Sequence, residues 1–333
     1  MFIQVFRFLG YYEKNLYKKS LKIKSITIIT LISLASFSIG YKGHDFIRKN
    51  ISLPIRSSLR FDPDISQYKK TNCPENSITI ATFGQSNSAN YVTEKSDVVI
   101  PSNLYQYDWK SQSCYLYKEP LLGASGTSGN AITYTAVKMA NISNKPIVII
   151  PFGVGGTSIL NWAYGDLSHQ HKIVMKRVKE SGLSPRIFLW HQGESDSQTT
   201  SFPLDEITKA PYFQQYYLQK GNRRGMIPLT EDVYYNALKK VVESTFKRYP
   251  QSSFGIALAT ICRNRNTQWN PVRSAQKRIS QDLPNTFISA DSDKITGLDK
   301  RPDNCHFSTK GASELGNLYY ESIIKEIKKN IGT

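Results

Sequence analysis

Short apolar runs alternate with helical patterns along most of the chain after residue 76. Each apolar run is continuous, which is typical of parallel strands that helices cover on both faces. This alternation predicts a three-layer α/β/α sandwich with a five-stranded parallel sheet. The strands are expected at residues 77–83, 146–150, 186–190, 254–259 and 286–289, and the helices at residues 131–140, 168–180, 230–249, 270–281 and 309–331.

Two polar stretches, residues 88–130 and 195–229, lack a clear pattern and are rich in Tyr, Ser and Gln. Ligands of an open parallel sheet bind outside the carboxyl ends of its strands. We therefore expect both stretches to lie near that edge of the sheet.

Residues 25–41 form a run of 17 residues without a charged side chain. As a helix the run would be about 25 Å long, at the short end for a membrane span. Six basic residues and one acidic residue precede it, so the positive-inside rule places residues 1–24 in the cytoplasm and everything after the run in the periplasm or outside the cell. We expect an uncleaved single-pass anchor, with a signal peptide cleaved near Ser36 or Ser38 as the alternative. Residues 42–76 contain three prolines and are expected to form a stalk or lead-in to a globular domain at residues 77–333.

All four cysteines follow this apolar run, at positions 73, 114, 262 and 305. An even number in an oxidising compartment permits two disulfides, with three connectivities open. No two cysteines are spaced as zinc ligands are, so no metal is expected.

The composition argues against a disordered chain and against a nucleic-acid-binding protein. Apolar residues make up 40% of the 333 residues, too many for a disordered chain. The 43 basic and 26 acidic residues give a formal charge of +17. The excess outside the N-terminal segment is diffuse, whereas nucleic-acid binding needs a concentrated basic stripe. We therefore expect no nucleic-acid partner, and a surface that tolerates acidic glycans.

Two polar motifs follow the first two predicted strands. Residues 84–87 read GQSN, and Ser86 in a strand-to-helix turn would present its hydroxyl at the sheet edge. Residues 152–158 read FGVGGTS, in which glycines let backbone N–H groups approach a ligand closely. No Gly-Lys-Ser/Thr follows, which excludes a Walker phosphate loop.

Two further motifs lie after the third strand and before the last helix. Residues 190–196 read WHQGESD and place amide, carboxylate and imidazole groups at one strand end. Asp303 precedes His306 by three residues and can hold its Nδ1–H, leaving Nε2 free to accept a proton.

The order of these four motifs resembles that of the SGNH hydrolase superfamily, and within it the sialate O-acetylesterase-like group that includes carbohydrate esterase family six. Members of that group read GQSN, then GGT followed by an apolar residue and a Trp, then QGES, and finally D-x-x-H. The second block appears here as residues 155–162, GGTSILNW. The resemblance covers residues 77–325 and implies a flavodoxin-like SGNH fold. Family members often carry Met after GQSN, where this chain has Ser88, a residue expected to line the pocket.

The resemblance assigns a role to each motif residue. Ser86 would be the nucleophile, His306 the general base and Asp303 the acid that orients it; Glu194 is the alternative acid. The oxyanion hole would combine the N–H groups of Ser86 and Gly155 with a side-chain donor. Gln192 is preferred over Ser195 for that donor, and the other pocket candidates are Gln85, Asn87 and Gly156.

Other aromatic and histidine residues have simpler expected places. Trp162 and Trp190 are expected in the core, and His169 and His171 on the surface of a helix. His191 is expected in the core or in the pocket. The Tyr-rich segments 105–117 and 211–217 are candidates to stack on sugar rings.

The resemblance implies a carbohydrate O-acetylesterase, and the N-terminal segment predicts that it is membrane-anchored and extracytoplasmic. It would release acetate from an acetylated sugar through an acyl-serine intermediate and would need no cofactor. One alternative is a glycan O-acetyltransferase with the same site. Another is a non-catalytic glycan-binding module, against which the intact Ser86, Asp303 and His306 argue.

One disulfide pairing follows from the predicted strand ends. Cys305 lies beside His306, and Cys262 follows the fourth predicted strand, so both should lie at the catalytic edge. We therefore predict a Cys262–Cys305 bond, which leaves Cys73 and Cys114 to pair.

Overall fold

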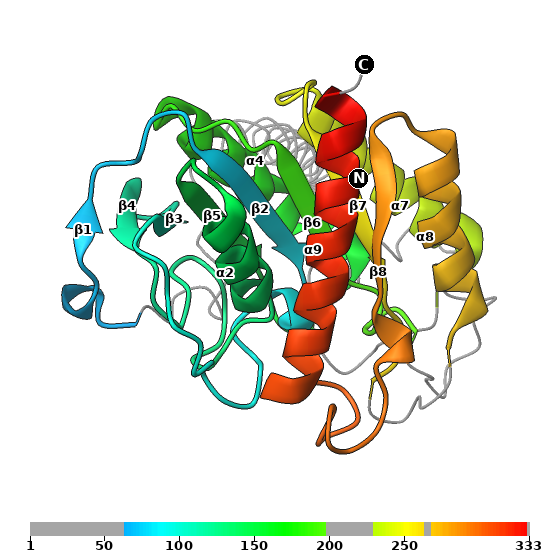
Figure 1. Cartoon of the computed structure of the whole chain (residues 1–333). Coiled ribbons are helices and arrows are strands. Elements are labelled where there is room, and N and C mark those ends of the chain that lie inside the picture. Colours follow the sequence, from blue (N-terminus) through cyan, green and yellow to red (C-terminus); the bar gives the residue numbers. More distant parts are fainter. Residues whose placement is uncertain (1–62, 198–228, 263–267, 332–333) are drawn as a thin grey trace, which may run out of the picture. The chain divides into compact units, whose positions relative to one another are not determined.

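The sheet in the computed structural model has eight strands in the spatial order β1-β4-β3-β5-β2-β6-β7-β8 (Figure 1). The structure describes residues 63–197, 229–262 and 268–331, which all fall within one compact unit, Ile55–Thr333. The strands are β1 (Lys70–Thr71), β2 (Ile78–Gly84), β3 (Leu104–Asp108), β4 (Ser113–Leu116), β5 (Ile147–Gly153), β6 (Ile187–His191), β7 (Ser253–Leu258) and β8 (Thr286–Asp291).

All five predicted strands are present as neighbours, in the order β5-β2-β6-β7-β8. They are mutually parallel, as the sequence predicted, and their order is that of a flavodoxin-like sheet.

The prediction of five strands was wrong, because β3, β4 and β1 extend the sheet beyond β5. β3 is parallel to β5, whereas β4 is antiparallel to both β3 and β1. These strands are two to five residues long and carry polar residues such as Gln106 and Asp108. They therefore lack the continuous apolar run that marks a strand buried on both faces. One of them, β1, lies within the predicted lead-in.

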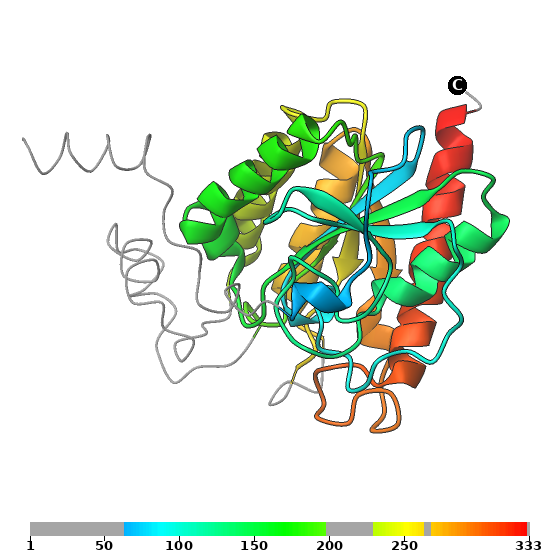
Figure 2. The same ribbon diagram turned by 90° about the vertical axis from the view of Figure 1, so that its left-hand side faces the viewer.

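Helices cover both faces of the sheet (Figures 1 and 2). One face packs against α2 (Ile132–Ile142) and α9 (Thr309–Ile331), and the other against α3 (Ile159–Ala163), α4 (Asp166–Glu180), α7 (Glu231–Phe246) and α8 (Asn270–Asp282). Alternate residues of β2 point to opposite faces, since Ile80 belongs to the α2/α9 cluster and Ala81 to the other. The three-layer sandwich is therefore confirmed.

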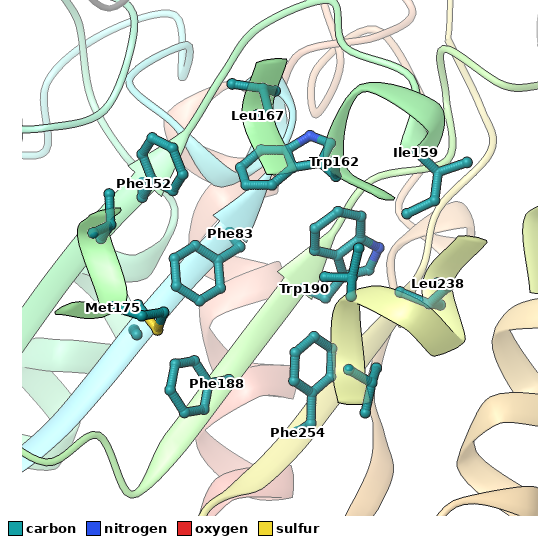
Figure 3. Packing of buried hydrophobic residues seen from close by; sticks show 14 of the residues in the cluster. Phe83, Phe152, Ile159, Trp162, Leu167, Met175, Phe188, Trp190, Leu238 and Phe254 are labelled. Atoms are coloured by element: carbon teal, nitrogen blue, oxygen red, sulfur yellow. The ribbon is translucent and has the colours of Figure 1, made fainter. Parts of the chain in front are cut away.

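An aromatic core fills the α4/α7 side (Figure 3). Phe83 stacks on Phe188 and meets Phe152 edge to face, and Trp162 packs edge to face on Trp190. Trp162 and Trp190 are 2% and 0% exposed, so their predicted place in the core is confirmed.

The expectation that His171 lies on the surface was wrong. His171 is buried edge to face against Phe83, with ring centroids 5.0 Å apart. Burial, together with the charges of Lys172 and Arg248, lowers the pKa of His171 to about 4. The buried stripe of α4 contains Leu167, and His171 lies four residues further on, on the same face of the helix.

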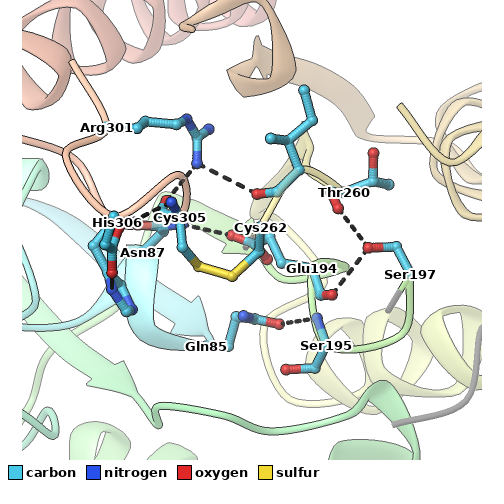
Figure 4. The surroundings of a disulfide bond; sticks show 12 residues. Gln85, Asn87, Glu194, Ser195, Ser197, Thr260, Cys262, Arg301, Cys305 and His306 are labelled. Carbon is cyan, nitrogen blue, oxygen red and sulfur yellow. Dashed lines mark hydrogen bonds and ion pairs between the residues drawn. A yellow bond between two sulfur atoms is a disulfide. The ribbon is translucent and has the colours of Figure 1, made fainter. Parts of the chain in front are cut away.

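The structure contains the two predicted disulfides. Cys73 joins the chain just after β1 to β4 at Cys114, and Cys262, shortly after β7, joins Cys305 (Figure 4). In the described part of the chain, no helix is both long and apolar enough to cross a membrane. The predicted tail, anchor and the stalk up to residue 62 lie outside that part.

The two disulfides close loops of nearly equal length, 41 and 43 residues. Replacing both cysteines of either bond by Ala should therefore lower the free energy of unfolding by a similar amount, about 4 kcal/mol in the chain-entropy model. Urea unfolding of the two double variants measures this. Hydrogen exchange should separate them, because losing Cys262–Cys305 should deprotect the amides around Cys305 and losing Cys73–Cys114 should not. Equal protection of those amides in the two variants would contradict the local role of the second bond.

Candidate active site

Three neighbouring strands end level at one edge of the sheet. Gly84 at the end of β2 is in register with Gly153 of β5 on one side and with His191 of β6 on the other. A Cβ on Gly84, whose φ is +128°, would lie 2.0 Å from the carbonyl oxygen of His191. Only glycine fits this position, and the level ends bring the first three motifs together.

Ser86 begins a short 3-10 turn, Ser86–Ser88, directly after β2. The Gln85 N–H donates to the carbonyl of His191 over 2.9 Å, which fixes the turn to β6. The Ser88 hydroxyl donates back to the carbonyl of Gln85 over 2.8 Å. Ser88 is buried and its hydroxyl is turned back to its own turn, and its place in the pocket stays a prediction.

Asn87 connects this turn to the other two motifs (Figure 4). Its side-chain amide donates to Glu194 Oε1 over 2.7 Å and to the carbonyl of Cys305 over 3.2 Å. Both amide hydrogens are thereby used, one toward the turn after β6 and one toward the loop that carries His306.

Asp303 and His306 form the predicted pair. Asp303 Oδ2 lies 2.7 Å from His306 Nδ1, and its Oδ1 accepts from the N–H groups of Cys305 and His306 over 2.9 and 2.6 Å. Partial burial alone would raise the pKa of Asp303, but these hydrogen bonds and the histidine charge outweigh it and hold that pKa below its usual range. The carboxylate is therefore ionised where it faces the imidazole.

Ser86 and His306 are brought near one another by the contact of their neighbours, Asn87 and Cys305. Among the described residues, no group forms a hydrogen bond with the Ser86 hydroxyl, so the expected Ser86–His306 bond is not formed here. Such bonds are often long before substrate binds.

Glu194 lies deeper than Asp303. It is 1% exposed, and its Oε1 faces Asn87 and, at 3.3 Å, His191 Nε2. His191 Nδ1 in turn lies 2.7 Å from the Tyr319 hydroxyl, so His191 belongs to the core. Burial would raise the pKa of Glu194, but His191 and Asn87 together lower it to about 2. The contacts thus favour Asp303 over Glu194 as the partner of His306.

A buried arginine holds the loop of His306. Arg301 is 2% exposed and donates to the carbonyls of Ile295 and Ser292, each over 2.8 Å, and to that of Cys305. Its guanidinium also lies over the ring of Phe307. The carbonyl of Cys305 therefore accepts from Arg301 and Asn87 together.

The geometry does not fit two of the expected oxyanion donors. Gln192 is fully buried, and its amide donates to Asp196 Oδ2 over 2.7 Å and to the carbonyl of Thr157 over 3.0 Å. The Gly155 N–H donates to the Ser125 hydroxyl over 2.8 Å. Both groups are already used in holding the site together.

Two other N–H groups remain available within the described residues. Neither Ser86 nor Gly156 donates its N–H to any described group. Gly156 has φ +67° and open space where a Cβ would lie. Gly156, which the sequence analysis named only as a pocket candidate, is therefore a better candidate oxyanion donor than Gly155.

Asp196 was missed by motif reasoning. It is fully buried, accepts from the N–H of Ile159 at the start of α3 over 2.8 Å, and orients Gln192. Burial raises its pKa to about 6. Asp196 lies two positions after Glu194 in the third motif, but nothing in the sequence shows that it accepts a hydrogen bond from Ile159 of the second motif.

Three of the four tyrosines in segment 105–117 do not offer their rings to a ligand, and the fourth, Tyr105, is half-buried and packs against the core. Tyr107, Tyr115 and Tyr117 are at most 5% exposed and pack inside the added strands or beside them. The second segment, 211–217, lies outside the described residues. Within those residues there is no group of three or more His, Cys, Asp or Glu that could hold a metal.

Comparison with known proteins gives one family match. Residues 81–203 match the family described as carbohydrate esterase, sialic acid-specific acetylesterase. This stretch holds the first three motifs, and Asp303 and His306 of the fourth lie after it. No curated protein matches the chain.

Solved structures resemble the fold at low identity. A protein from Arabidopsis thaliana is 19% identical with a TM-score of 0.53, and the match covers 76% of this chain and 99% of that one. NanS is 14% identical with a TM-score of 0.47, covering 77% and 99%. A carbohydrate acetylesterase from Xanthomonas citri is 14% identical with a TM-score of 0.46, covering 73% and 54%. The first of these shows the fold, and the other two are too distant to add to it.

The family match falls on three of the four motifs that carried the resemblance, within a sheet of the expected order. The predicted resemblance to the sialate O-acetylesterase-like group is therefore confirmed over residues 81–203, which match a family of carbohydrate acetylesterases.

Proposed function

We propose that this chain hydrolyses acetyl esters on a glycan through an acyl-serine intermediate, with Ser86, His306 and Asp303 as its triad. The observation that carries the proposal is the 2.7 Å contact between Asp303 Oδ2 and His306 Nδ1, on a loop that Asn87 ties to the turn of Ser86. An ionised carboxylate there holds the imidazole in the tautomer whose Nε2 is a base.

The reaction would have two steps, acetylation of Ser86 and hydrolysis of the acetyl-serine. His306 Nε2 takes the proton of Ser86 while Oγ attacks the acetyl carbonyl, and the protonated imidazole then gives that proton to the departing sugar hydroxyl. Water repeats the sequence on the acetyl-serine and releases acetate. The N–H groups of Ser86 and Gly156 would stabilise the oxyanion in each step, and a single donor of this kind is typically worth about 3 kcal/mol.

The substrate class rests on the family description and on charge. The matched family is described as specific for sialic acid, an acidic sugar. The net positive charge of residues 51–333, formally +10, would favour the approach of an acidic, acetylated glycan.

The cellular place is a further part of the proposal. A basic segment followed by an uncharged run at residues 25–41 favours a membrane-anchored enzyme with its catalytic domain outside the cytoplasm. The two disulfides support an oxidising compartment.

The triad predicts a non-additive loss of activity. Ser86→Ala and His306→Ala should each lower kcat for acetate release from an acetylated sugar about 10⁴-fold or more, and the double variant should be no worse, because the two residues act as one unit. Acetate release by wild type and variants, with and without a glycan acceptor, measures this. Retained activity in Ser86→Ala would refute the mechanism, and transfer of the acetyl group to the acceptor in place of hydrolysis would identify a transferase.

The two acids should be separable by conservative substitution. Asp303→Asn should lower kcat about 100-fold or more, because His306 loses the carboxylate that orients it. Glu194→Gln should cost less, since the amide oxygen can still accept from Asn87. With a pKa of about 2, Glu194 is ionised throughout the range above pH 4, so Glu194→Gln should leave the acid limb of the rate profile in place. A greater loss in Glu194→Gln, with folding intact by circular dichroism, would make Glu194 the orienting acid.

The N-terminal segment predicts membrane association. The full chain should fractionate with membranes, keep its N-terminal peptide and be digested by protease added from outside. Deleting residues 1–45 should release an esterase with unchanged kcat, because no candidate site residue precedes Gly84. A soluble natural protein with a mature N-terminus near Ile39 would show a cleaved signal instead, and protection from the protease in intact cells would overturn the proposed location.

A further inference from the structure

Tyr91 lies flat against His306. The two rings are stacked with centroids 5.5 Å apart and planes 20° from parallel. Tyr91 follows the turn of Ser86 by five residues, outside all four motifs. The face of the candidate base is thus covered by a side chain from the segment that follows the candidate nucleophile.

Two glycines make room for this ring. A Cβ on Gly155 would lie 2.6 Å from the Tyr91 hydroxyl, and a Cβ on Gly126 would lie 2.9 Å from Cε2 of the same ring. Any side chain at either position would push the ring away from the imidazole.

The backbone on both sides of Tyr91 is fixed. The N–H of Asn90 donates to the carbonyl of Ser125 over 2.9 Å, and the N–H of Thr93 donates to the carbonyl of Phe307 over 3.0 Å. The second bond ties the Tyr91 segment to the residue that follows His306. Ring and imidazole are therefore held in one frame.

The imidazole needs such a contact. Its side chain is 19% exposed and that of Asp303 is 48% exposed, so packing encloses this pair less than it does the buried Glu194. The covalent bond to Cβ and the hydrogen bond to Nδ1 hold one side of the ring, and small rotations about χ1 and χ2 that keep this hydrogen bond still displace Nε2. A stacked aromatic ring restrains these rotations and so holds the plane of the imidazole.

We propose that Tyr91 is a positioning residue for His306, which acts by holding the plane of the imidazole so that Nε2 points to Ser86. This inference rests on the proposed role of His306 as the base. Its effect should fall on kcat rather than on KM, because the ring acts on the base and a small shift of a reacting group can cost about 100-fold in rate.

Two substitutions in the full chain separate the ring from its hydroxyl. Tyr91→Phe keeps the stacked ring and should retain kcat within about threefold, whereas Tyr91→Leu should lower kcat for a small acetyl ester about 10- to 100-fold with KM nearly unchanged. Tyr105→Leu, at a half-buried tyrosine of β3, is the matched control for loss of packing and should leave kcat unchanged.

Nuclear magnetic resonance gives a readout that does not depend on activity. The Cε1–H signal of His306, identified by its absence in His306→Gln, should lie upfield in wild type and Tyr91→Phe and move downfield in Tyr91→Leu. An unchanged kcat in Tyr91→Leu, or an equal loss in Tyr91→Phe, would overturn the positioning role. A wild type with the upfield signal and no Ser86-dependent hydrolysis would instead refute the proposed function.

Discussion

The two hydrogens of the Asn87 amide join segments that are 107 and 218 residues away in the sequence. One hydrogen bonds to the carboxylate of Glu194 and the other to the backbone beside His306. In a buried site, each of these polar groups would be destabilising without its partner, by about 1–3 kcal/mol. Within the described residues, Asn87 is therefore the one side chain that bonds the turn of Ser86 both to the turn after β6 and to the loop of His306, and the geometry of the candidate site depends on it.

The two acids near this amide differ in burial, since Glu194 is buried and Asp303 is exposed. Glu194 is enclosed with His191 and stays ionised because His191 and Asn87 compensate for its lost solvation. Asp303 lies in an exposed loop, where backbone N–H groups and His306 hold its charge. Glu194 holds the turn of Ser86 in place through Asn87, and Asp303 faces the imidazole of His306.

Much of this arrangement could be predicted from sequence, because buried parallel strands and their ends leave strong signals. The five apolar runs place Ser86, Gly155 and Glu194 just beyond the ends of β2, β5 and β6, where the structure has them. Short edge strands such as β3 leave weaker signals, because neighbouring loops and the partner strand supply their burial. The hydrogen-bond partners of Gln192 could not be predicted, because the partners of a buried amide come from elements distant in the sequence. Tyr91 was missed for a related reason, since a stacking contact follows no spacing rule.

Arg301 has a consequence for how the loops of this enzyme can change during evolution. Its guanidinium binds the backbone carbonyls of Ile295, Ser292 and Cys305, and carbonyl oxygens are the same whatever side chain a residue carries. Substitutions at the exposed positions among these loops would therefore leave the bonds intact, provided that the backbone keeps its course. The loops beside His306 are therefore free to change in sequence, while the arginine that holds them is not.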